Sequence, residues 1–260
     1  MNNSFSLSRF SNLFRKHTAE HYKSYLMSLV VITGILFIWV SFHMIMHKRP
    51  MDIDTQFITF MFMFLLSGTI FTSAVFSELG EQKKAIALLT LPASPLEKFF
   101  VKWLYSYIIF QFVFVGIFYI VMEPMQNLFH EDAEHKKELL NIFHYPMKNV
   151  FIAYAVLHAI AIWGAIFFKK FHFIKTTFAA LIVLMVFLIA NRQIMEAMLK
   201  RNILSAVPFI SADFVTKDRY HYISITLPEG TGDYLPYMLV ILITFIFWTA
   251  AYFRLKEKQV

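Results

Sequence analysis

The chain has no cysteine, few glycines and few charged residues. Among its 260 residues there are no Cys and 7 Gly, and 16% are Asp, Glu, Lys or Arg. The lack of cysteine excludes disulfide bonds and thiolate metal sites. The glycines are not clustered as phosphate-binding loops require, so the common nucleotide-binding motifs are excluded as well. Soluble domains carry about a quarter charged residues, and this chain falls well below that proportion.

What the chain has instead is six long apolar blocks. Hydrophobic residues make up 58% of the sequence, and 31 of the 260 residues are Phe. A helix needs about 20 apolar residues to cross a bilayer. Because lipid cannot solvate backbone amides, each block is predicted to be a helix. The predicted fold class is therefore an all-α integral membrane protein, with spans at residues 25–46, 56–77, 99–122, 149–168, 172–194 and 235–253.

The segment before the first block, residues 1–24, is too polar to span a membrane. Apolar residues and one histidine recur in it at helical spacing, and the basic residues lie off this stripe. The stripe consists of Phe10, Leu13, Phe14 and His17. This pattern predicts an amphipathic helix lying on the membrane surface, and the alternative is a disordered basic tail. A membrane domain over residues 25–253 and a tail over residues 254–260 complete the predicted organisation.

The charge distribution predicts the orientation in the membrane. With six spans, both termini lie on the same side. The segments on that side hold 14 Lys and Arg against five Asp and Glu, whereas those on the other side hold 10 against 12. Because Lys and Arg accumulate on the cytoplasmic side, both termini are predicted to be cytoplasmic. The basic excess then reflects topology and contact with the anionic lipid of the bilayer, and no nucleic-acid partner is predicted.

The connection between the second and third blocks, residues 78–102, is the most informative loop. Residues 81–91 have the pattern of a short amphipathic helix that Pro92 ends. Ser94 and Glu97, with Pro95 at the first helical position, form a capping box, which predicts that a new helix starts at Ser94 and runs into the third span. We therefore predict two short helices separated by a turn, and not a slack tether.

Two long external segments are predicted, at residues 124–148 and 195–234. The third span is expected to end at Glu123 and Pro124, and residues 131–143 have the pattern of a short helix. Residues 221–234 alternate between polar and apolar and contain turn residues, which predicts a small β-hairpin.

Several polar side chains lie within the spans. The second block carries four hydroxyl residues, Thr69, Thr72, Ser73 and Ser77. Such residues favour close helix packing, and the alternative is that they line a substrate path. Gln111 lies in the third block and His158 in the fourth. His158 is predicted to pack beside Trp163 and the hydroxyls of the second block, but an ionisable residue inside a membrane is also a candidate for a function.

Metal and catalytic sites are not predicted. The pairs His17/His21 and His43/His47 have the i,i+4 spacing of two metal ligands on one helix face, but neither has a carboxylate in register as a third ligand. The sequence contains no G-x-S-x-G motif and no acidic residue in mid-membrane. These absences argue against an enzyme and against ion-coupled transport, and no cofactor is predicted.

The layout resembles the permease subunits of type-2 ABC exporters. Members of that family have an amphipathic N-terminal helix, six spans, a cytoplasmic connection between spans 2 and 3 and a large external segment before span 6, which is longer here than in many members. The most specific similarity lies in residues 77–104, where the family has an acidic residue, a variable helix, a turn of the form LLxLPxS and a second short helix. The matching residues are Glu78, Glu81, Leu91, Pro92, Ser94, Pro95 and Lys98.

The resemblance implies an exporter subunit in the bacterial cytoplasmic membrane, with a second permease copy or a homologue as its partner. It also implies a separate cytoplasmic ABC ATPase, which docks on residues 78–102. The residues that it assigns to ATPase coupling are Glu78, Glu81, Lys83, Lys84, Ile86, Leu88, Leu89, Pro92, Ser94, Pro95 and Glu97. The alternative is a six-span scaffold or assembly factor that transports nothing. A co-purifying ATPase, or an adjacent ATPase gene, would separate the two.

Overall fold

The computed structural model describes residues 5–80, 90–128, 138–144, 146–168, 170–200, 203–208, 211–215, 222–226, 228 and 231–258. It is mainly helical, and six of its helices are long and apolar enough to cross a membrane. The fold predicted from the apolar blocks, an all-α membrane protein, is confirmed. The helices are α1 (Leu7–His47), α2 (Ile53–Gly80), the continuous run of α4 (Pro95–Trp103), η1 (Leu104–Ile109) and α5 (Phe110–Asn127), α6 (Met147–Phe167), α7 (His172–Leu199) and α8 (Thr231–Glu257).

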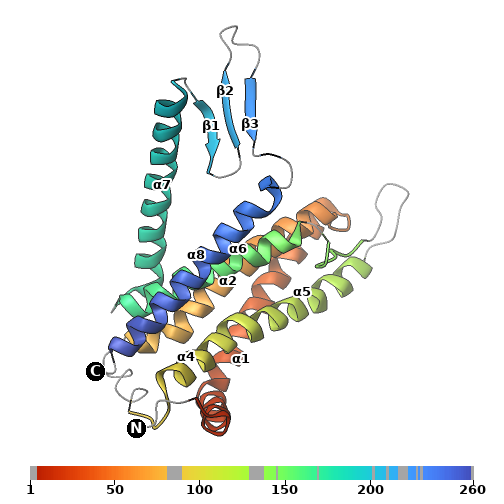
Figure 1. Ribbon diagram of the computed structural model, residues 1–260. Helices are drawn as coiled ribbons and strands as arrows, with labels where there is room; N and C mark the ends of the chain where they lie inside the picture. Colours follow the sequence, from red (N-terminus) through yellow and green to blue (C-terminus); the bar gives the residue numbers. More distant parts are fainter. Residues whose placement is uncertain are drawn as a thin grey trace.

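Helix α1 joins the predicted surface helix and the first span into one element. Its 41 residues extend over about 60 Å, twice the thickness of a bilayer core. The first turns, dark red in Figure 1, are viewed nearly end-on, whereas the later turns rise along the bundle, so the helix bends. Leu13, on the apolar stripe of residues 1–24, is buried against Val101 and Tyr105. The stripe therefore packs on the protein itself.

Helix α2 begins just after Asp52, in the turn that follows α1. The Asp52 carboxylate accepts hydrogen bonds from the Thr55 backbone at 3.1 Å and from the Thr55 hydroxyl at 2.8 Å. Burial acts to raise the pKa of Asp52, but these hydrogen bonds outweigh it and hold the pKa below its ordinary value. The cap therefore stabilises α2 at neutral pH and is lost only when acidification protonates Asp52.

Helix α6 packs between α2 and α8 at the centre of the bundle (Figure 1). Two glycines allow its closest contacts. A Cβ atom on Gly68 of α2 would fall on the ring of Tyr154, and a Cβ on Gly164 of α6 would fall on the side chain of Thr176 in α7. The surrounding core is aromatic, with Phe60, Phe64, Phe110, Phe114 and Phe118 buried in one cluster.

The third span is continuous but not uniform. As the capping box predicts, a helix starts after Ser94 and runs into the membrane, but η1 is a π-helical segment that no pattern in the sequence indicated. Such segments are often found at functional sites. The span also continues to Asn127, three residues beyond the predicted end at Pro124. Pro124 therefore lies inside the helix, where it removes one backbone donor.

Helix α7 stands apart from the bundle over most of its length (Figure 1). Of its residues only Thr176, near its start, is buried. Beside the far end of α7 lies an antiparallel sheet, in the order β1 (Ile203–Val207), β2 (Ser211–Val215) and β3 (Tyr222–Thr226) (Figure 1).

The hairpin predicted over residues 221–234 is wrong. Residues 222–226 do form strand β3, but this strand pairs with β2, with Asp213 opposite Ser224. Residues from Thr231 onward already belong to α8. An alternating pattern indicates a strand but does not specify which strand will pair with it.

The short helix predicted over residues 131–143 is wrong in its described part, residues 138–143, and the rest lies outside the described residues. Side chains from two spans bind this backbone instead. The Gln56 side chain accepts from the Leu140 N–H at 3.0 Å and donates to the Glu138 carbonyl oxygen at 2.8 Å. The Tyr119 hydroxyl donates to the Leu140 carbonyl oxygen at 2.6 Å. Because these backbone groups have partners, a helix is not needed to satisfy them.

Candidate functional site

The candidate site lies where α2 ends and α4 begins, at the end of the bundle that also holds both termini (Figure 1). The predicted capping box is confirmed here. The Ser94 hydroxyl accepts from the Glu97 N–H at 3.2 Å, and the Glu97 carboxylate accepts from the Ser94 N–H at 2.9 Å, with Pro95 at the first helical position. The start of α4 is therefore specified by its own local sequence.

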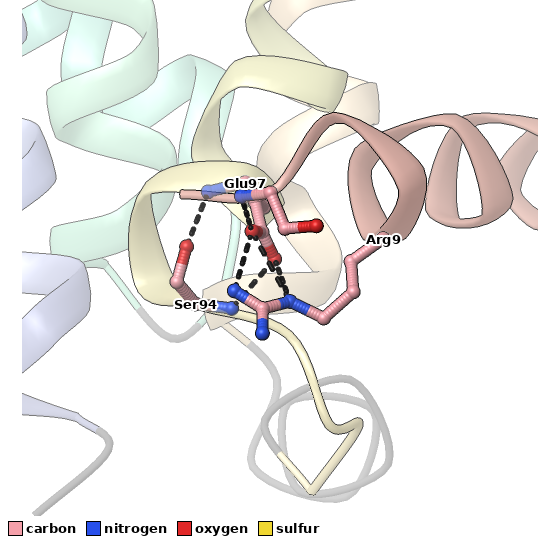
Figure 2. Close-up of polar contacts among 4 residues, drawn as sticks. Arg9, Ser94 and Glu97 are labelled. Atoms are coloured by element: carbon pink, nitrogen blue, oxygen red, sulfur yellow. Dashed lines mark hydrogen bonds and ion pairs between the residues drawn. The ribbon is translucent and has the colours of Figure 1, made fainter. Parts of the chain in front are cut away.

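The same carboxylate fastens α4 to the start of α1, as Figure 2 shows. Glu97 is fully buried, and its Oε1 atom accepts from the Ser6 N–H at 2.8 Å and from Arg9 Nη2 at 3.0 Å. A buried carboxylate costs free energy unless it is paired and hydrogen-bonded, and Glu97 meets both conditions. Arg9 lies 88 residues away in the sequence, so no local pattern could have indicated this pair.

A second buried charge, Lys102, ties α4 to the end of α2. Its Nζ atom lies 2.6 Å from the Glu78 carboxylate and donates to the Val75 carbonyl oxygen at 2.8 Å. The side chain of Lys102 is 2% exposed and that of Glu78 is 25% exposed. His21 of α1 lies 3.4 Å from the same carboxylate. Glu78, which the resemblance assigns to ATPase coupling, is thus the point where α1, α2 and α4 meet.

Aromatic contacts hold the first turns of α1 against the third span. The ring of Tyr105 in η1 stacks on Phe14 with 4.9 Å between ring centres, and its hydroxyl is hydrogen-bonded to Thr18. His17 Nε2 lies 2.6 Å from the Tyr25 hydroxyl within α1. The start of α1, the end of α2 and the start of the third span therefore form one connected unit.

The predicted coupling residues divide into two groups. Six of them lie outside the described residues: Glu81, Lys83, Lys84, Ile86, Leu88 and Leu89. Among the others, Pro92 is exposed at the turn, Pro95 is half-buried, and Ser94 and Glu97 are buried. The described part of the connection consists of two anchored ends, one at Glu78 and the other at residues 94–97.

The hydroxyl groups of α2 mostly bond to their own helix. Thr69, Thr72 and Ser77 each donate to a carbonyl oxygen three or four residues earlier. The Gln111 amide likewise donates to the Tyr107 carbonyl oxygen at 2.9 Å. Thr72 and Ser73 are buried within the bundle, and the Ser73 hydroxyl has no hydrogen-bond partner. The internal hydrogen bonds of Thr69, Thr72 and Ser77 favour a packing face over a path that presents free hydroxyls to a substrate.

His158 lies at the centre of a buried chain of hydrogen bonds that joins three helices. Trp248 Nε1 of α8 donates to His158 Nδ1 at 3.2 Å, and His158 Nε2 lies 2.9 Å from Ser106 Oγ. An indole N–H can only donate, so a neutral His158 carries its proton on Nε2 and donates it to Ser106. The Ser106 hydroxyl in turn donates to the Lys102 carbonyl oxygen at 2.9 Å.

This arrangement differs from the prediction, which placed His158 beside Trp163 and the α2 hydroxyls. Its hydrogen-bond partners are instead Ser106 and Trp248. In the tautomer just described, Nε2 already holds a proton and cannot accept that of the serine. The pair therefore lacks the geometry of a serine activated by a general base. The chain of hydrogen bonds from Trp248 through His158 to Ser106 is instead a polar link from α8 through α6 to η1, next to the buried Lys102.

The described part of the chain contains no group of three His, Asp or Glu side chains placed to hold a metal ion. The His17 and His21 rings are 4.5 Å apart between centres, but they bond to Tyr25 and Glu78 respectively. The rings of His43 and His47 stack on each other at 4.2 Å.

Comparison with known proteins does not assign the chain to a family. It matches no model of a known protein family, no curated protein and no solved structure. What the protein does is therefore inferred from its topology and from the geometry of the α2–α4 connection.

Proposed function

We propose that the chain is the transmembrane permease subunit of an ABC exporter, driven by a separate cytoplasmic ATPase. The ATPase docks on the connection between α2 and α4, residues 78–102, which passes ATP-driven motion to the spans. The protein lies in the bacterial cytoplasmic membrane with both termini in the cytoplasm, on the same side as the ATPase. The sequence of residues 88–94, LLTLPAS, has the pattern typical of such permeases.

The observation that carries the proposal is that buried charges anchor both ends of the connection. Glu97 at one end is bound to Arg9 of α1, and Lys102 of α4 is bound to Glu78 at the other end. Burying a charge costs several kcal/mol before its partner compensates it, and a loop that merely joins two helices has no need of such anchors. A segment that transmits force to α1, α2 and α4 does need them.

Purification of the tagged permease from its native membrane tests the function. In mild detergent, we expect an ATPase subunit with its own nucleotide-binding motifs to co-purify in a fixed ratio, and its rate of ATP hydrolysis to rise when the permease is present. An unrelated tagged six-span protein from the same membrane is the control. A permease that binds no ATPase, even when the ATPase from a neighbouring gene is co-expressed, points instead to a scaffold.

The orientation is tested with single cysteines, since the chain has none of its own. We expect a membrane-impermeant maleimide to label cysteines at Asn127 and Asp213 in intact cells, but to label one at Lys256 only after permeabilisation. Lys258 is unsuitable because it donates hydrogen bonds to two other helices. Labelling of the Lys256 position alone in intact cells would contradict the proposed topology.

We also predict two permease subunits in each complex, because six spans are half the usual number that encloses a path. Gly68 and Thr72 of α2 are small enough to suit close contact between two copies. They are already used within the chain, since Gly68 packs on Tyr154 and Thr72 is buried. Other helices have to form the contact, and α7 offers a long exposed apolar surface. A native mass spectrum that contains one permease per particle, with or without ATPase, would rule the dimer out.

A further inference from the structure

The last two turns of α2 are held by lysines from two sides. Lys258, which follows α8, donates from Nζ to the Leu79 carbonyl oxygen at 2.8 Å and to the Ile166 carbonyl oxygen at 2.6 Å. Lys102 of α4 donates to the Val75 carbonyl oxygen, one turn earlier on α2, at 2.8 Å. Residues 81–89, the central part of the connection, follow directly after Gly80, the last residue of α2.

The two carbonyl groups bound by Lys258 occupy equivalent places. Leu79 and Ile166 are the penultimate residues of α2 and α6. Carbonyl groups in the last turn of a helix are not satisfied by the helix's own hydrogen bonds, and they carry the negative end of its dipole. An ammonium group between two such ends satisfies both, and hydrogen bonds from a charged donor are stronger than neutral ones. One lysine thus joins the ends of α2 and α6 to α8.

Apolar packing reinforces this position. Val75, Phe76 and Leu79 in the last two turns of α2 are buried, in one cluster with Ile166 and Leu255. The end of α2 is therefore held relative to α4, α6 and α8 by both charged and apolar contacts.

We propose that Lys258 and Lys102 are positioning residues that fix the last turn of α2, so that motion of the connection is passed to the spans and not absorbed at the helix end. This role rests on the proposed function of residues 78–102. It differs from that of a lysine that only extends toward the membrane surface, because it requires a donor at one particular place. Lys256, two residues earlier and exposed, provides the comparison.

Amide hydrogen exchange on the purified permease tests the position of the turn. In Lys258→Met, which keeps an unbranched side chain but removes the donor, we expect exchange in residues 76–80 and 164–167 to be roughly tenfold faster, because local opening no longer breaks two charged hydrogen bonds. Exchange in α5 should stay unchanged, as should exchange everywhere in the control Lys256→Met. Lys258→Arg, which keeps charged donors, should restore most of the protection.

A second readout separates this inference from the proposed function. In the complex, Lys258→Met should keep the ATPase bound but lose most of its stimulation. Unchanged exchange at the end of α2 overturns the inference, and so does faster exchange with full stimulation. If no ATPase binds even to the wild-type permease, the proposed function fails and the coupling role fails with it, whatever the exchange result. Should Lys258→Met fail to fold, Lys258→Gln is measured in the same way.

Discussion

Replacing Glu78 by glutamine is expected to lower the free energy of unfolding by about 3 kcal/mol. The Lys102 ammonium is almost fully buried and lies 2.6 Å from the Glu78 carboxylate. Glutamine has nearly the same size as glutamate but no charge, so the substitution leaves a buried ammonium without its counterion. Equilibrium unfolding in mild detergent, followed by tryptophan fluorescence or by resistance to denaturant, measures the loss.

Two further variants show whether the loss comes from the ion pair. Glu78→Gln combined with Lys102→Met should recover much of the stability, because replacing both members of a buried ion pair by uncharged groups is often close to neutral. Glu257→Gln is the matched control. Glu257 lies 2.6 Å from Arg254, but their side chains are 63% and 45% exposed, so the loss should stay below about 1 kcal/mol. Equal losses for Glu78→Gln and this control would contradict the anchoring of α2 by Lys102.

The double substitution Glu81→Arg, Leu88→Asp is expected to weaken ATPase binding at least about a hundredfold while leaving insertion and folding intact. A helix that docks in a groove of its partner is held by apolar residues at i, i+3 and i+4 spacing, with charges around them. Ile86, Leu88 and Leu89 have that role in our proposal, and Glu81 belongs to the charged rim. A hundredfold loss corresponds to about 2.8 kcal/mol. Titration of the purified ATPase against the permease in nanodiscs measures it.

A matched control makes the same chemical changes on another surface at the same end of the molecule. Leu7 and Glu20 of α1 are both exposed, so Leu7→Asp with Glu20→Arg alters charge and apolar area equally. We expect this control to bind the ATPase with nearly wild-type affinity. If the variant in the connection also binds and stimulates the ATPase normally, residues 78–102 are only a turn and the coupling role is wrong.

The features that could be predicted from the chain are those with local physical causes. An apolar block of about 20 residues has to be a helix in lipid, whatever surrounds it, and all six predicted spans are present. The capping box at Ser94 and Glu97 was equally predictable, because each residue satisfies a backbone donor of the other only three positions away. The exact ends of the spans were less predictable. Proline usually marks a helix boundary, but Pro124 and Pro236 both lie inside helices.

The partners of the buried charges were not predictable. Arg9 and Glu97 are 88 residues apart, and Lys258 lies 179 residues from Leu79. The same holds for His158, which bonds to Ser106 and Trp248, and for β3, which pairs with the preceding strand and not with a following one. Hydropathy and helical spacing place each residue on a segment and on a face. Which charge, carbonyl or strand lies opposite depends on how the helices pack, and packing is a property of the whole bundle.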